Sequence, residues 1–130
     1  MGRKKIFLNR IKLVQPSKIE NISKKALEIE DEYKKIEELK KIPLVKNALT
    51  SVILTFYDPK NYGVFDIHVY DELFKTNSKT RPKDLFANSK HYIRVLRKLR
   101  KIANNYNIDV RTVEKALFKK NYTESNKRRS

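Results

Sequence analysis

Cysteine is absent from this 130-residue chain, and glycine occurs only twice. Without cysteine there is no disulfide, no thiolate nucleophile and no thiolate zinc site, a composition typical of a reducing compartment. The two histidines, His68 and His91, are too few for a metal site built from several imidazoles. We therefore expect no metal and no cofactor, and a core held together by packing alone.

Long apolar runs are also missing. No stretch reaches the roughly 18–20 apolar residues that a membrane-spanning helix needs. The first residues, MGRKKIFLNR, are basic, but no apolar stretch long enough for a signal peptide follows them. The sequence thus predicts a cytoplasmic protein without membrane insertion.

Positive charge is abundant. Lysine and arginine total 31 against 15 acidic residues, which gives a net charge of +16. Net charge bears on partners and solubility rather than on fold. Because phosphates attract cations whatever the base sequence, nucleic acid is the first expected partner and an anionic membrane surface the second. The alternative is a lysine-rich surface that only keeps the protein soluble.

Basic residues gather at both ends of the chain. Residues 1–15 contain no acid and are predicted to form a basic arm, and residues 123–130 a short basic tail. Between them the sequence predicts one helical domain over residues 16–122. Three cations of the arm are candidate nucleic-acid contacts, namely Arg3, Lys4 and Lys5.

Apolar periodicity predicts an all-α domain of about five helices. In residues 17–40 the apolar side chains recur at alternating steps of three and four, as on one long amphipathic helix. Residues 44–56 are apolar around most of the circumference and are expected to fill the middle of the core. A short helix after Asp66, a helix over residues 88–107 and a final helix complete the prediction.

The predicted helix over residues 88–107 separates apolar from basic side chains. A period of 3.6 residues places its cations opposite its apolar face, and no acid lies between Asp84 and Asp109. Ordinary outer faces mix charges of both signs. A phosphate backbone would relieve the repulsion between the cations and release counterions. We call this candidate phosphate-binding surface the basic stripe, and it consists of Lys90, Arg94, Arg97, Lys98 and Lys101.

Asp66 is the candidate catalytic residue. It directly precedes an apolar helical pattern, so its carboxylate is first expected to be an N-cap that accepts hydrogen bonds from the opening amides. A catalytic role remains the alternative. Tyr57, Tyr62 and Phe65 surround the preceding loop and suit either base stacking or packing on the core.

Two segments, IPLVKNALTSVIL (residues 42–54) and YGVFDIHVYDEL (residues 62–73), resemble the helix-hairpin-helix DNA glycosylase superfamily. The family's hairpin and next helix read L-P-G-V-G-x-x-T-A-x-x-x-L, and a later helix opens V-D-T-H with the catalytic aspartate at its cap. The resemblance covers about residues 16–120 and implies the fold of one helical lobe, with Asp66 in the aspartate's place. The matching positions are Ile42, Pro43, Val45, Val52, Leu54, Val64, Asp66 and His68.

The chain departs from this family at the hairpin. Leu44 and Lys46 stand where the two glycines let the backbone turn and present its N–H groups to phosphate. The lysine nucleophile of the bifunctional family members would fall near Ala48 in this chain, so the resemblance does not imply lyase chemistry. The chain is also shorter than a two-lobed enzyme that grips a flipped base. Lys46, beside the altered hairpin, is a further candidate for phosphate contact.

The sequence therefore favours a small basic protein that binds nucleic acid, DNA rather than RNA, mainly through phosphates, and the resemblance implies a link to DNA repair. Two alternatives stay open. One is DNA base excision, in which Asp66 stabilises positive charge on the sugar as the base departs. The other is a protein-interaction module whose acidic first helix docks a basic partner, including a second copy of the chain.

Overall fold

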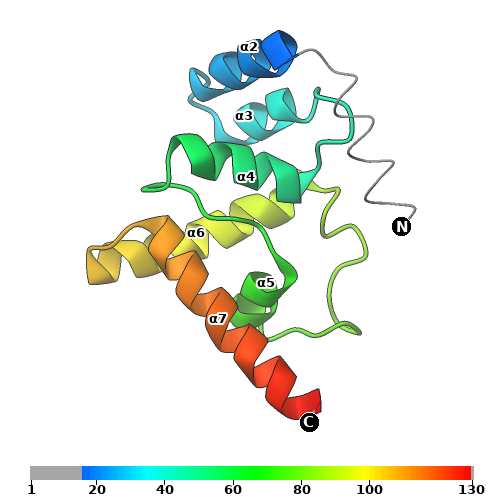
Figure 1. The fold of residues 1–130 in the computed structure, drawn as a ribbon, viewed down its shortest axis with the longest axis vertical. Coiled ribbons are helices and arrows are strands. Elements are labelled where there is room, and N and C mark those ends of the chain that lie inside the picture. The colour runs from blue at the N-terminus through cyan, green and yellow to red at the C-terminus, as the bar shows by residue number, and fades with distance from the viewer. Residues whose placement is uncertain (1–15, 130) are drawn as a thin grey trace. The chain divides into compact units, whose positions relative to one another are not determined.

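The computed structural model describes residues 16–129, and these form six α-helices and no β-strand (Figure 1). The all-α prediction is confirmed, with six helices rather than about five. They are α2 (Pro16–Leu27), α3 (Glu32–Leu39), α4 (Asn47–Tyr57), α5 (Ile67–Phe74), α6 (Ser89–Tyr106) and α7 (Val110–Arg129). None of these helices is long and apolar enough to cross a membrane. Within the described residues, contacts define two compact units, one that ends at Lys46 and one that begins at Asn47.

The first unit contains two helices, α2 and α3, where the sequence predicted one. Asp31 is extended (φ −68°, ψ 120°), and its carboxylate accepts a hydrogen bond from the Lys34 amide at 2.9 Å. This N-cap satisfies an opening amide of a new helix and so competes with continuation of the old one. The prediction of a single helix was therefore wrong at residues 28–31. The apolar spacing survives the break, since Ala26, Ile36 and Leu39 are buried.

A tight turn at residues 42–45 follows α3. The Val45 amide donates to the Ile42 carbonyl at 3.1 Å, with Pro43 and Leu44 at the corner. Leu44 has a φ of 68°, and this left-handed region costs a residue with a Cβ about 1–2 kcal/mol. The backbone thus adopts a conformation that favours glycine, at one of the two positions where the helix-hairpin-helix motif has it.

We expect Leu44→Gly to be more stable than Leu44→Ala by about 0.5–1 kcal/mol, because only glycine relieves the left-handed strain, and this relief outweighs its greater freedom in the unfolded chain. Alanine is the reference because Leu44 is only 36% exposed, so either truncation removes apolar contacts. Lys46→Gly beside Lys46→Ala is the control, since Lys46 has no positive φ. Urea unfolding of the four variants checks this, and equal midpoints for the two Leu44 variants would contradict it.

The second unit packs α4, α5, α6 and α7 around Phe65 and Tyr92, whose ring centres lie 5.6 Å apart. The chain between α4 and α5 runs through this core, where the Tyr92 hydroxyl donates to the Gly63 carbonyl at 2.9 Å. A Cβ on Gly63 would lie 2.9 Å from Cβ of Glu114 on α7. Glycine is therefore what lets this segment pass so close to α7, which packs against α5 (Figure 1).

The core-facing side of α4 is polar. The Ser51 hydroxyl accepts a hydrogen bond from the Phe65 amide at 2.7 Å. The Asn47 side-chain amide donates to the carbonyls of Leu85 and Asn88, at 2.9 and 2.8 Å. These bonds satisfy backbone groups of two loops that would otherwise be unpaired in the core. The buried polar residues of α4 are Asn47, Thr50, Ser51 and Thr55.

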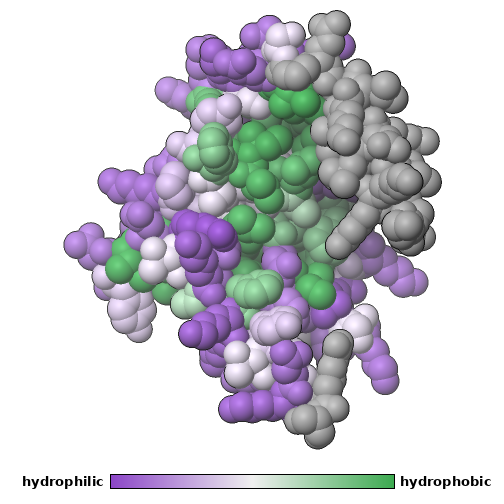
Figure 2. All heavy atoms as spheres, viewed as in Figure 1, coloured by the Kyte–Doolittle hydropathy of each residue, from purple (hydrophilic) through white to green (hydrophobic). Residues whose placement is uncertain are grey.

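The apolar side of α4 is exposed in part. Val52 is 46% exposed and Phe56 is 79% exposed, and apolar residues are visible over α4 in the surface view of Figure 2. The expectation that this helix is buried around most of its circumference is therefore wrong for this side. Hydrogen-bond demand from the loops, rather than hydropathy, decides which side of α4 faces the core.

Candidate nucleic-acid interface

The basic stripe lies along one face of α6, and all five of its side chains are exposed. The helix begins at the N-cap Asn88, whose side chain accepts from the Lys90 amide at 3.0 Å, and ends at Asn107, which is left-handed (φ 52°). The buried face holds Tyr92, Val95, Leu96, Leu99 and Ala103. The predicted separation of basic and apolar faces is confirmed.

The positive charge of the basic stripe is not compensated by acidic side chains of the described residues. Within residues 16–129 none of its five side chains forms an ion pair. The acid that precedes the stripe, Asp84, is occupied elsewhere: it accepts from the Asn88 amide at 3.0 Å and lies 2.8 Å from the His91 ring nitrogen. Hydrogen bonds from Asn88 and then His91 hold the pKa of Asp84 below its ordinary value. The positive potential of the stripe is thus available to a ligand.

Phe74, the last residue of α5, positions two cations of the stripe. The Arg94 guanidinium carbon lies 4.7 Å and the Lys98 ammonium 5.1 Å from the centre of the Phe74 ring. Attraction to the ring face restricts both side chains. The ring itself packs on Tyr70, 4.6 Å away between centres. Periodicity could not reveal this contact, because it joins two helices that are distant in sequence.

A groove of about 320 Å³ opens between α5, α6 and α7 beside the stripe. We call it the lysine groove because four of its lining residues are lysines. Two of them, Lys98 and Lys101, also belong to the basic stripe. The other two are Lys75, at the end of α5, and Lys120 on α7.

Asp66 caps α5, as the sequence predicted. Its carboxylate accepts from the His68 amide at 2.8 Å, and its backbone is extended (φ −144°, ψ 152°). It also lines a pocket of about 250 Å³ with Arg111 and Glu114. The structure does not bring Asp66 to the stripe, which contacts Phe74 at the opposite end of an eight-residue helix, about 12 Å away.

Four further cations were predicted as phosphate contacts. Lys46 is exposed just before α4. Arg3, Lys4 and Lys5 lie outside the described residues.

The aromatic residues around the loop before Asp66 separate into two groups. Tyr62 and Phe65 are buried, which confirms the prediction that they pack in the core. The alternative prediction, that they stack on bases, is wrong for these two residues. Tyr57 is half exposed and forms an edge-to-face pair with Phe56, with ring centres 5.3 Å apart. Of these three residues, Tyr57 alone keeps a surface on which a base can stack.

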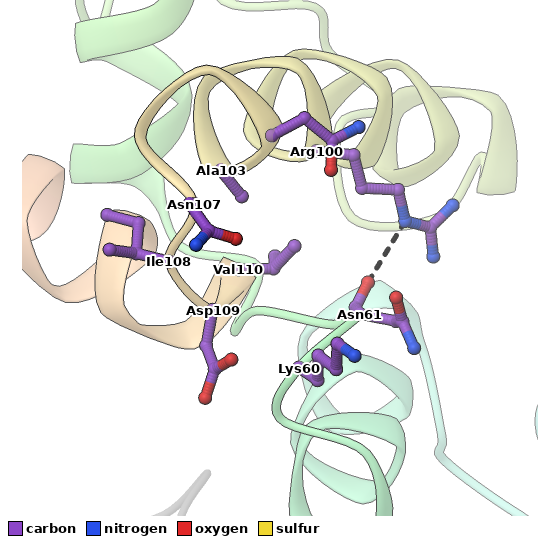
Figure 3. A pocket seen from close by; sticks show the side chains of 9 residues that line it. Lys60, Asn61, Arg100, Ala103, Asn107, Ile108, Asp109 and Val110 are labelled. Atoms are coloured by element: carbon purple, nitrogen blue, oxygen red, sulfur yellow. Dashed lines mark hydrogen bonds between the residues drawn. The ribbon is translucent and has the colours of Figure 1, made fainter.

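A third hollow, of about 210 Å³, lies where α6 meets α7 (Figure 3). Here Arg100 donates from Nε to the Asn61 carbonyl at 3.0 Å. The first amide of α7, on Val110, donates to the Lys60 carbonyl at 3.0 Å. Arg100 therefore connects α6 to the loop that follows α4. The Val110 amide already donates to Lys60, so it is not free to bind a ligand.

No protein-family model, curated protein or solved structure matches the chain. In the described part of the chain, no cluster of three or more His, Asp and Glu side chains could hold a metal ion. The resemblance to helix-hairpin-helix glycosylases therefore stays a hypothesis that rests on residues 42–54 and 62–73.

We expect Asp66→Ala to lower the free energy of unfolding by about 0.5–2 kcal/mol, because it leaves the His68 amide without its acceptor. Asp66→Asn should change it by only a few tenths of a kcal/mol, since asparagine caps helices about as well as aspartate. Chemical unfolding of the three proteins measures both differences. Equal destabilisation by the two variants would show that charge, rather than the cap, is what Asp66 contributes.

Proposed function

We propose that the protein binds nucleic acid through phosphate contacts made by the basic stripe. The observation that carries this proposal is the set of five exposed cations on one face of α6, unpaired with any acid in residues 16–129. Each cation that neutralises a phosphate releases condensed counterions, which drives association. Such contacts carry no sequence information, so we expect little preference among base sequences.

The spacing of the charges suits a strand of nucleic acid. From Lys90 to Lys101 the stripe extends about 16 Å along the helix axis. Five cations over that length enclose four intervals of about 4.1 Å on average, somewhat wider than the 3.4 Å of axis per phosphate along one DNA strand. The charge density of the stripe is therefore comparable to that of the backbone that it would contact.

Two of the central cations are arginines, Arg94 and Arg97. A guanidinium can donate two parallel hydrogen bonds to one phosphate, which an ammonium cannot do. The Phe74 ring already restrains Arg94, which reduces the entropy lost when a phosphate binds. We therefore expect the strongest contacts at the middle of the stripe.

Charge reversal of the two arginines tests the proposal. Arg94→Glu/Arg97→Glu should weaken binding to duplexes of unrelated sequence alike, by at least about tenfold at roughly 50 mM salt, and should reduce the salt slope by about 2. Lys79→Glu/Lys83→Glu is the matched control, because both lysines are exposed in the loop before α6 and the change in net charge is the same.

The two double variants separate a local interface from a general effect of charge. Retained binding in the control and lost binding in the arginine variant supports the stripe. Equal weakening in both would mean that affinity follows net charge alone and would contradict the assignment. The acids Glu28 and Asp31 lie in the first unit, and their replacement should leave binding intact.

DNA base excision at Asp66 is a second candidate. The pocket beside Asp66 also contains the partly exposed ring of Phe118, which suits the stacking of an unpaired base. The carboxylate could then stabilise positive charge on the sugar. Asp66→Asn keeps the cap and removes the charge. Excision from a panel of damaged duplexes that disappears in this variant would support an enzyme, and no excision by the unaltered protein would remove this candidate.

A further inference from the structure

The lysine groove gathers positive charge from three helices around one acid. Its walls carry four lysines and Glu72. Four positive charges and one negative charge leave a net charge of +3 around a space of about 320 Å³. Pockets of a few hundred cubic ångströms are the size that small ligands occupy. The apolar lining residues are Leu73, Ile102 and Leu117.

Glu72 lies beside two of the ammonium groups. It is 7% exposed, accepts a hydrogen bond from Lys75 at 3.1 Å and lies 3.6 Å from the Lys120 ammonium. Its Oε1 oxygen has no hydrogen-bond donor among residues 16–129. The Lys75 and Lys120 side chains are 76% and 58% exposed, so the carboxylate draws their ammonium groups toward the groove and leaves them accessible to a ligand. Glu72 is thus a positioning residue for Lys75 and Lys120.

A third ammonium group is restrained from the other side. Lys98 lies over the Phe74 ring, so three of the four lysines in the groove have a partner that limits their motion. Free surface lysines lose considerable side-chain entropy when they bind a ligand. Lysines that are already held lose less, which favours binding of an anion at the groove over binding at scattered lysines.

The groove and the stripe differ in the anion they suit. A phosphodiester within a strand carries one negative charge, and the open stripe can follow several of them. A phosphate monoester carries about 1.5 to 2 negative charges at neutral pH. Several ammonium groups around one groove favour the more highly charged group, which a phosphorylated strand end carries and an internal phosphodiester does not.

We propose that the lysine groove binds the terminal phosphate monoester of a nucleic-acid strand. Lys98 and Lys101 belong to both surfaces, so a strand along the stripe can end in the groove. This inference rests on the proposed function of the stripe and adds to it a preference for phosphorylated ends. The groove supplies Lys75 and Lys120, which the stripe lacks.

The test compares short labelled duplexes that carry a 5′-phosphate, a 3′-phosphate or only hydroxyl ends, with the full chain at roughly 150 mM salt. One phosphorylated end should bind about tenfold more tightly than the hydroxyl end, as one added charge-assisted contact would give. Lys75→Gln/Lys120→Gln should remove this preference and leave the affinity for hydroxyl-ended duplex within about twofold. Lys79→Gln/Lys83→Gln is the control and should keep the preference.

The outcomes separate the groove from the stripe. Binding with equal affinity for all ends would overturn the groove and leave the stripe standing. A preference that survives Lys75→Gln/Lys120→Gln, with an unchanged unfolding midpoint, would place the end elsewhere and also overturn the groove. A protein that binds no duplex, yet whose Lys75 and Lys98 amide resonances shift with inorganic phosphate, would be a receptor for a small phosphate. That outcome would overturn both the strand end and the proposed function.

Discussion

Leu54→Ala is expected to lower the free energy of unfolding by about 3–4 kcal/mol, within the range for truncation of buried leucines. Leu54 is fully buried and lies on the same face of α4 as Asn47 and Ser51. Those two residues hydrogen-bond to loops of the second unit, so this face is fixed toward the core. Removal of the side chain there leaves a cavity that the rigid surroundings fill only partly.

Phe56→Ala provides the contrast on the same helix. Truncation of a buried phenylalanine lowers the free energy of unfolding by about 3–5 kcal/mol. Phe56 is 79% exposed, so its truncation should lower that free energy by less than about 0.5 kcal/mol. Urea unfolding of the two variants therefore tests the orientation of α4, and Leu54→Ala should be the less stable of the two. A larger loss for Phe56→Ala would show that the apolar side of α4 is covered and that its polar side does not face the core.

Arg81→Ala is expected to lower the free energy of unfolding by roughly 3 kcal/mol, the low end of the range for breaking a buried ion pair. Asp71 is buried and accepts two hydrogen bonds from Arg81, at 2.8 and 2.5 Å, and one from the Thr76 hydroxyl at 2.7 Å. The hydrogen bond to Asp71 raises the pKa of Arg81. Loss of the guanidinium leaves a buried carboxylate without its counter-charge, and the remaining exposure of Arg81 softens the effect.

The free energy of unfolding of Arg81→Lys should lie between those of the unaltered protein and Arg81→Ala, because lysine keeps the charge but cannot form both parallel hydrogen bonds. Lys79→Ala, an exposed neighbour in the same loop, is the control and should change stability by less than about 0.5 kcal/mol. Thermal and urea unfolding measure all three. If Arg81→Ala behaved like Lys79→Ala, the pair would contribute nothing to holding this loop on α5.

Local patterns in the sequence were sufficient for some features. Asp66 as a cap depends on the residues that immediately follow it, and the basic stripe depends on a period within a single helix. Both were predicted and both are present. The break before α3 was also local, but the apolar spacing continues across residues 28–31 and conceals the cap at Asp31.

Other features depend on contacts between segments far apart in the chain. The orientation of α4 is set by bonds from Asn47 to a loop about forty residues away. Hydropathy alone predicted burial around most of the helix and could not show which side faces the core. Phe74 beneath Arg94 and Lys98, and the pairing of Glu72 with Lys120, likewise join separate helices. Such features of the candidate site require the tertiary structure.

The salt dependence of nucleic-acid binding tests the central claim most directly. If the five cations of the basic stripe each neutralise a phosphate, a plot of log K against log salt for a duplex should have a slope of about −4.5, because each contact contributes about −0.9. Arg94→Glu/Arg97→Glu should flatten that slope by about 2, and Lys79→Glu/Lys83→Glu should leave it unchanged. Affinity that does not change with salt, or a slope that the arginine variant leaves intact, would contradict phosphate binding by the stripe on α6.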